Sequence, residues 1–244
     1  MTTGGTPGVN FSAAQGAWTN IGAGGLTVTS TPSGIVYGTY QISSNSSGAP
    51  IVAAGVINLG IFSQTDTYVS GSGTETVPSG ASYVTIYVWG GGGSGASKFA
   101  GTGAAEGGGG GAFCVSTGLA VTAGQTFTYA VGAGGAGVAG PASGNSGGAS
   151  TVTGTSVSIT AGGGQGGQLG VSGGTGGTAT GGTTTNNAGQ AGQTAAAGGA
   201  GGNNGNSTGG GNPGGGAPGG GSQGYANSLT SPNGGAGQIT FNYS

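Results

Sequence analysis

Glycine recurs at third positions in the second half of this chain, and this repeat limits the possible folds more than any other feature. Between Ala161 and Gly224 the repeat comprises Gly174, Gly177, Gly189, Gly192, Gly198, Gly201, Gly210, Gly216 and Gly219. A period of three matches the polyproline II helix, which has three residues per turn and no internal hydrogen bonds. With glycine along one ridge, neighbouring helices can approach until their main chains bond to one another, with weak Cα–H···O contacts added. We therefore predict packed polyglycine-type helices over 161–224, with a loose loop as the alternative interpretation.

The sequence on either side of this stretch has the pattern of β-strands. All Phe, Trp and Tyr residues lie before Gly132 or after Gly224, so the material for a hydrophobic core is at the two ends. In the run from Ser82 to Trp89, aliphatic residues point to one face of a strand and mostly aromatic residues point to the other. This alternation predicts a strand that is partly covered on both faces. Other expected strands, rich in β-branched and aromatic residues, are 25–31, 34–43, 50–62, 66–71, 112–116, 126–131, a short one near 151, 156–160 and 237–244.

These patterns predict an all-β chain with two domains. A small N-terminal β domain is expected at residues 1–75. A glycine-rich β domain is expected at residues 76–244, with a β-sandwich-like core and the polyproline II-type insertion at 161–224.

Charged residues are almost absent, and this excludes several classes of partner. Lys98 is the only basic residue, so the chain cannot neutralise several phosphates, and no nucleic-acid binding is expected. No stretch of about 18 apolar residues occurs, so no membrane insertion is expected. The formal net charge is -2. With so few charges to screen, stability and assembly should hardly respond to salt.

The chain also lacks the side chains of common catalytic sites. General acid–base catalysis and nucleophile activation need clustered titratable groups, but the only acids are Asp66, Glu75 and Glu106, and histidine is absent. Two of these acids could pair for glycoside hydrolysis, although scattered acids are more often structural. We expect no enzymatic activity, no cofactor and no metal. Cys114, in an apolar strand pattern, is expected to be a buried thiol, and Lys98 and Glu106 are expected to form an exposed ion pair.

Five motifs occur in an order that resembles a known family. They are VPSGASYVTIYVWGGGGSG, GGGGGAFCVSTGLAVTAGQTFTYAVGAGGAG, GGASTVTG, ITAGGGQGG and the terminal GGAGQITFNYS. Together they are similar to the glycine-rich domain at the ends of bacteriophage tail fibres and related virion proteins. The resemblance covers about Thr76 to Ser244. It implies a β-sandwich-like domain with glycine-rich excursions, used as a structural or receptor-binding part of a phage particle.

The resemblance leads to one main functional hypothesis. The protein is expected to be a structural virion protein on the particle surface, either a tail-fibre or spike component or a capsid decoration fibre. Its N-terminal domain would serve for docking to other virion proteins of the particle or for oligomerisation. A homotrimer is expected, because three glycine-rich segments that bury one another's backbone would offset an ordering entropy of about 1 to 2 kcal/mol per residue.

Two alternatives remain open at this point. Some phage adhesins of similar composition stack polyglycine helices with variable loops at one edge, so the chain could be a dedicated distal adhesin for a host surface glycan or protein. The candidate receptor contacts are Lys98, Phe99, Asn186, Asn187 and Tyr225. Springtail antifreeze proteins also stack glycine-rich polyproline II helices, so ice binding through Gly173 to Thr185 is the other alternative.

Overall fold

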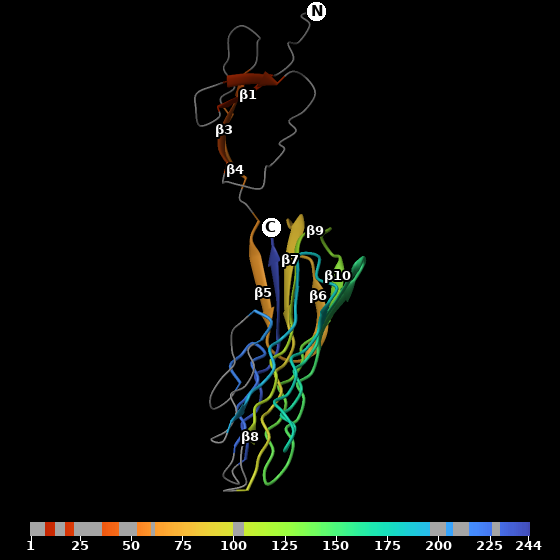
Figure 1. Ribbon diagram of the computed structural model, residues 1–244. Coiled ribbons are helices and arrows are strands. Elements are labelled where there is room, and N and C mark those ends of the chain that lie inside the picture. Colours follow the sequence, from red (N-terminus) through yellow and green to blue (C-terminus); the bar gives the residue numbers. More distant parts are fainter. Residues whose placement is uncertain are drawn as a thin grey trace, which may run out of the picture. The chain divides into compact units, whose positions relative to one another are not determined.

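The computed structural model describes residues 62–99, 105–195, 204–206, 215–225 and 230–244, together with the backbone of four earlier strands (Figure 1). The chain divides into two compact units, Met1–Phe62 and Ser63–Ser244. This division falls before the boundary that the sequence predicts after residue 75. The reason is that β5 (Gln64–Tyr68) and β6 (Ser72–Thr76) are edge strands of the two sheets of the second unit, where β5 pairs with β16 and β6 pairs with β10.

The first unit contains an antiparallel four-stranded sheet in the order β2-β1-β3-β4. Its strands are β1 (Gly8–Ser12), β2 (Trp18–Ile21), β3 (Val36–Ser43) and β4 (Ala53–Leu59). Strands β3 and β4 lie within the ranges expected from their Val, Ile and Tyr content. The strand expected at 25–31 lies outside the described residues.

The second unit contains two antiparallel five-stranded sheets that pack as a sandwich, in the orders β14-β9-β7-β16-β5 and β13-β12-β11-β10-β6. Its further strands are β7 (Tyr83–Trp89), β9 (Phe113–Ala120), β10 (Thr126–Ala130), β11 (Ser150–Gly154), β12 (Val157–Ala161), β13 (Ala179–Thr180), β14 (Thr185–Asn187) and β16 (Gln238–Tyr243). A separate pair joins β8 (Ala105–Glu106) to β15 (Thr194–Ala195). The described residues contain no helix, so the all-β prediction is confirmed for them.

The core of the sandwich follows from the alternation along β7. Val84, Ile86 and Val88 are fully buried, whereas the residues between them are partly exposed on the outer face. Phe127 of β10 meets Phe241 of β16 across the sandwich, with ring centroids 5.7 Å apart. Burying each such side chain stabilises the fold by about 1.5 to 3 kcal/mol.

A bundle of extended segments continues from the strands of the sandwich (Figure 1). Along segment 90–98, every third N–H donates to segment 105–112, and the next N–H of each triplet donates to segment 142–148. These bonds run from Gly90, Gly93 and Ala96 to Ala112, Gly109 and Glu106, and from Gly91, Ser94 and Ser97 to Gly148, Asn145 and Ala142. The donors thus repeat with the three-residue period of a polyproline II helix, and the bonds join different segments.

Segments 90–98 and 105–112 form the centre of this glycine bundle. Main-chain bonds join 90–98 to neighbours on all sides, at 105–112, 132–138, 142–148, 162–168, 215–225 and 230–237. A methyl group at Gly92 would lie 2.0 Å from the carbonyl oxygen of Gly220, and one at Gly109 would lie 2.0 Å from that of Thr175. A strand can therefore be followed directly by four glycines, because main chains occupy the space that side chains would need.

Extended segments whose main-chain bonds recur every three residues occupy much of the described part of 161–224, as the polyproline II-type prediction requires, but the prediction was too narrow. Segments 162–168, 172–178, 188–193 and 215–225 belong to the glycine bundle, so the loop interpretation is wrong for them. The bundle begins much earlier, at Gly90. Gly198, Gly201 and Gly210 lie outside the described residues.

Candidate functional site at the bundle tip

The bundle segments reverse direction at the end of the bundle that is far from the sandwich (Figure 1). We call this end the bundle tip and define it as residues 98–99, 138–143, 168–171 and 225. Main-chain bonds hold these parts together: Ser97 pairs with Ala142, and the N–H of Lys98 donates to the carbonyl of Tyr225 at 2.8 Å. Described parts of four excursions of the chain thus meet at one surface.

A buried ion pair lies directly beneath this surface. Lys98 Nζ is 2.8 Å from Glu106 Oε1, and the two side chains are 11% and 2% exposed. The sequence predicted the pair but placed it at the surface, and that placement is wrong. Both residues belong to the central segments of the bundle, so neighbouring main chains cover them. Burial removes most solvent screening, and each charge therefore depends on the other.

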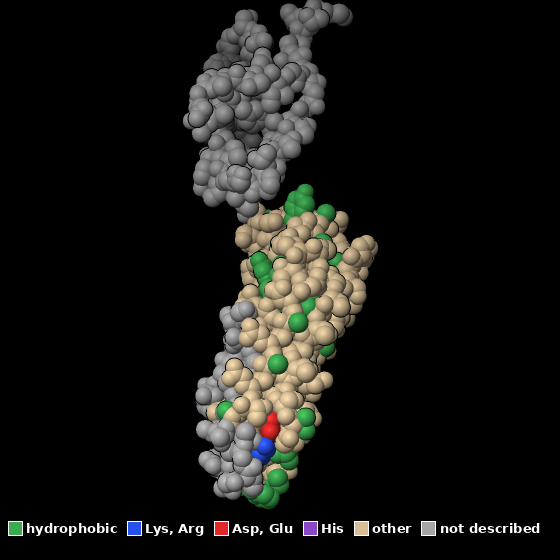
Figure 2. Space-filling view, in the orientation of Figure 1, with side chains coloured by type: hydrophobic (Ala, Val, Ile, Leu, Met, Phe, Trp, Pro, Cys, Tyr) green, Lys and Arg blue, Asp and Glu red, His purple; other side chains and the backbone are tan. Residues whose placement is uncertain are grey.

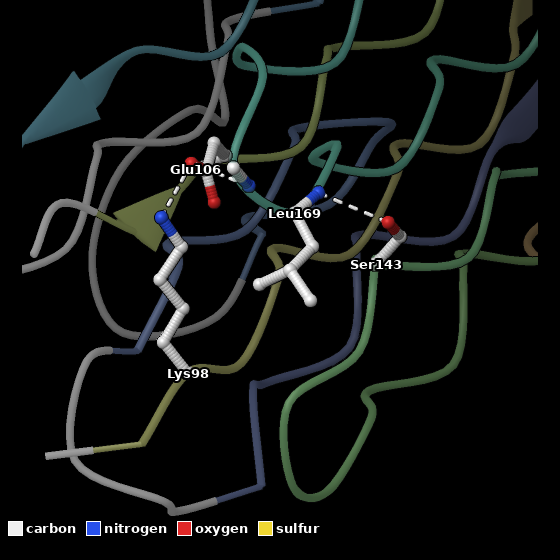
Figure 3. A network of polar contacts seen from close by, with 5 residues as sticks. Lys98, Glu106, Ser143 and Leu169 are labelled. Carbon is white, nitrogen blue, oxygen red and sulfur yellow. Dashed lines mark hydrogen bonds and ion pairs between the residues drawn. The ribbon is translucent and has the colours of Figure 1, made fainter. Parts of the chain in front are cut away.

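The Glu106 carboxylate also anchors a loop from another part of the chain. Its Oε1 accepts a hydrogen bond from the N–H of Gly170 at 3.1 Å, and Ser143 Oγ accepts one from the N–H of Leu169 at 2.9 Å (Figure 3). Gly170 has a φ of +74°, a conformation that favours glycine. Two side chains from different segments therefore fix the reversal at 169–171. The second carboxylate oxygen, Oε2, is buried without a hydrogen-bond partner.

Two large apolar side chains next to this anchor point are exposed. Phe99 follows Lys98 in the chain and is 55% exposed, and Val171 follows Gly170 and is 78% exposed. Figure 2 shows hydrophobic side chains at this end of the bundle, beside the single blue and single red patch. The remaining acids, Asp66 and Glu75, are on β5 and β6 of the sandwich, so the tip carries no net charge. Exposed apolar side chains gathered at one end of a molecule make that end a candidate contact surface.

The five residues proposed from the sequence as receptor contacts fall into two places. Lys98, Phe99 and Tyr225 come together at the bundle tip, although the Lys98 side chain is buried and paired. Asn186 and Asn187 are exposed on β14, where they pair with β9 of the sandwich. The Asn186 side chain also bonds in both directions to the main chain of Gly182, at 2.8 and 2.6 Å, and so closes its own turn.

Sequence reasoning did not select Glu106, Ser143 or Val171 as parts of this site. Two of these residues have a signal in the sequence. Val171, like Leu169, is a large apolar residue in a glycine-rich stretch, and Glu106 is the only acid in a run of small residues. Ser143 has no comparable signal, since serine is frequent throughout the chain.

The other buried carboxylate joins the two sheets of the sandwich. Glu75 on β6 accepts hydrogen bonds from the hydroxyl of Tyr68 and from that of Tyr243, the latter at 2.9 Å. The hydrogen bond to Glu75 raises the pKa of Tyr68, and burial, followed by the bond to Glu75, raises the pKa of Tyr243. Asp66 accepts a bond from Gln64 at 2.7 Å. All three acids from which a pair for glycoside hydrolysis was considered therefore have structural partners, since Glu106 pairs with Lys98.

The remaining reactive groups are few. Cys114 is fully buried, as the sequence predicted, and burial raises the pKa of its thiol. Within the described ranges, no three His, Cys, Asp or Glu side chains are grouped to hold a metal ion. No helix in those ranges is long and apolar enough to cross a membrane.

A β-sandwich that continues into a bundle bonded main chain to main chain defines a glycine-rich β protein. The chain belongs to the glycine-rich domain family, whose sequence model matches residues 63–244. The match begins where the second compact unit begins. A comparison with curated proteins gives no match.

Proposed function

We propose that the protein is a structural component of a bacteriophage particle, either a tail-fibre or spike component or a capsid decoration fibre, whose bundle tip faces the host surface. The order of the sequence motifs supports this proposal. The observation that carries it is the glycine bundle, which holds a cluster of chain reversals at one end. Each main-chain hydrogen bond contributes about 0.5 to 1.5 kcal/mol net, so the many bonds across the bundle resist shear and extension.

The chemistry of the tip agrees with a contact function for a host glycan or protein. Phe99 and Val171 offer apolar area, and the charges of Lys98 and Glu106 compensate each other beneath it. Adhesion would then depend on apolar contact and main-chain hydrogen bonds, and hardly on ionic strength.

The proposal includes a homotrimer and docking through the N-terminal region, but the physical reason for a trimer changes. Segments of a single chain already bury one another's main chain in the bundle. A trimer is therefore not needed to order the glycine bundle, and its contacts would lie on other surfaces. We expect an SDS-resistant or trimeric species of the purified chain.

Location on a particle is the first test. Purified phage particles are analysed by mass spectrometry and by electron microscopy with an antibody against this chain. The proposal predicts labelling of fibres or spikes, with copy numbers in multiples of three. Purification as a stable monomer that is absent from particles would reject it.

Adsorption tests the role of the tip. Particles that carry Phe99→Ala and Tyr225→Ala should adsorb to host cells more slowly than wild type. Thr175→Ala is the matched control, because Thr175 is exposed on the side of the bundle. Equal adsorption by wild-type particles, by particles with the Phe99 and Tyr225 substitutions and by the Thr175→Ala control would remove the receptor-contact role of the tip and leave the structural role.

One observation favours ice binding as a second candidate. Thr175 and Thr178 are exposed three residues apart on segment 172–178, as a regular threonine ridge requires. The chain enters β13 at Ala179, however, so only part of the expected surface from Gly173 to Thr185 lies on the bundle. Thermal hysteresis of the purified protein decides between the two functions.

A further inference from the structure

We infer that Glu106 is a positioning residue, which holds loop 169–171 where Val171 and Phe99 form one apolar contact surface. This inference rests on the proposed role of the bundle tip in host contact. It adds that the contact surface is assembled before binding, by a buried carboxylate that does not itself touch the host.

The carboxylate is placed for this role by two hydrogen bonds on one oxygen atom. Glu106 Oε1 accepts from Lys98 Nζ at 2.8 Å and from the N–H of Gly170 at 3.1 Å. The residues that follow these two donors in sequence are Phe99 and Val171. One oxygen atom therefore contacts both excursions of the chain that carry an exposed apolar residue, and these excursions are about 70 residues apart in sequence.

Both anchors are attached to rigid main chain. Glu106 lies on β8, pairs with Thr194, and its carbonyl accepts a bond from the N–H of Ala96 at 2.8 Å. Lys98 donates its own N–H to Tyr225. Loop 169–171 has fewer such supports. The main chain of Gln168 bonds to Ser172 and accepts a bond from the N–H of Val171 at 3.0 Å, so the loop is closed only on itself. The side-chain acceptors described for its other N–H groups, Glu106 and Ser143, are what join it to neighbouring segments. Loss of Glu106 should therefore affect this loop before it affects the bundle.

The ion pair also decides which surfaces the tip can bind. Because Lys98 is the only basic residue of the chain and Glu106 compensates it, no free charge remains at the tip. The partner is therefore an uncharged, partly apolar surface, and binding should persist at high salt.

The test uses the full-length protein with Glu106→Gln. Glutamine replaces the charged acceptor of the Gly170 N–H by a neutral oxygen, which accepts a weaker hydrogen bond. Its amide group also has no acceptor at the position of Oε2, and Lys98 loses its counter-charge. Glu75→Gln is the matched control, because it changes the other buried carboxylate, in the sandwich. The measurements are hydrogen exchange of the Gly170 amide, and binding of labelled protein to a panel of intact bacterial strains in low and high NaCl.

We expect Glu106→Gln to speed exchange at Gly170 about tenfold and to lower cell binding by a similar factor, while amides of the sandwich stay protected. Glu75→Gln should change neither quantity at the tip. Unchanged exchange at Gly170 would overturn the anchoring role. Faster exchange with unchanged binding would overturn the positioning role but leave the proposed function standing.

Two further outcomes keep the inference open to rejection. If the wild-type protein binds no strain, the proposed receptor-contact role of the tip fails and this inference fails with it, while the structural role is left standing. If Glu106→Gln does not fold, Ser143→Ala replaces it, because it removes the neighbouring anchor of the same loop without leaving a buried charge. Ser143→Ala should speed exchange at Leu169 and weaken binding more mildly, and no change in either would overturn the inference.

Discussion

A single methyl group in the centre of the glycine bundle should disrupt it, and Gly109→Ala is the sharpest case. The new Cβ would lie 2.0 Å from the carbonyl oxygen of Thr175, 2.5 Å from its carbonyl carbon and 2.8 Å from the carbonyl oxygen of Gly174. All three are main-chain atoms, so no side chain can rotate away. Segment 172–178 would have to move outward by roughly 1 Å or more to reach ordinary van der Waals contact.

The cost follows from the bonds that this movement would break. The N–H groups of Gly174 and Gly177 donate to segment 105–112 at 2.8 Å, and Gln165 donates to Thr175 at 2.8 Å. A shift of about 1 Å takes all three beyond hydrogen-bond range. Each buried group left without a partner costs about 1 to 3 kcal/mol, so the loss is about 3 to 9 kcal/mol. A domain with a typical stability of 5 to 15 kcal/mol would lose a large fraction of it.

The assay is thermal unfolding monitored by circular dichroism, with Gly148→Ala as the matched control. At Gly148 the nearest atom to a new Cβ is the main-chain nitrogen of Ala133, at 3.2 Å, so a small adjustment is enough. We expect Gly109→Ala to lower the Tm by about 10 °C or more and Gly148→Ala to change it by only a few degrees. If the two variants melt within about 2 °C of each other, main-chain contact is not what holds the bundle together.

Further predictions concern the charges and tyrosines. Lys98→Met should destabilise the protein by about 3 to 5 kcal/mol in urea, because it leaves Glu106 buried without a counter-charge, whereas Lys98→Met combined with Glu106→Gln should restore most of the loss; equal losses would contradict this account. Tyr68 and Tyr243 have a raised pKa in the folded state, so their contribution to stability is complete below pH about 10, where tyrosine ionises in the unfolded chain, and declines above it. Tyr243→Phe should make the fall of Tm above that pH less steep, and an identical slope would argue against the linkage. The Tm of the wild type should change by less than about 2 °C between low and high NaCl, and a large shift would reveal ionic contacts that the sequence does not suggest.

The sequence was most informative where one face of an element is buried. Strands β7, β10 and β16 lie within one residue of their expected bounds, because burial between two sheets imposes a two-residue period. Strand β9 continues to Ala120, past the expected end at 116. It does so by pairing with Tyr83 and Val84 across a register shift, and its residues there carry no apolar pattern.

The glycine bundle was predictable in kind but not in extent or pairing. The runs of consecutive glycines at 90–93 and 107–111 fit a repeat of any length, so they do not indicate a three-residue period. Main-chain bonds are also independent of side-chain identity, so the sequence does not indicate which segments become neighbours. The burial of Lys98 and Glu106 depends on those neighbours, which explains why an ion pair that the sequence predicted was placed at the surface.

Because main-chain bonds hold the bundle together, its folding does not depend on which side chains point outward. Ala136, Gln165 and Thr175 are exposed on successive segments, and none of them supplies the bonds through its side chain. Outward positions and chain reversals are then free to change under selection while the inward glycines are not. A scaffold of this kind can acquire new surface specificities by point substitution, without a compensating change in its interior.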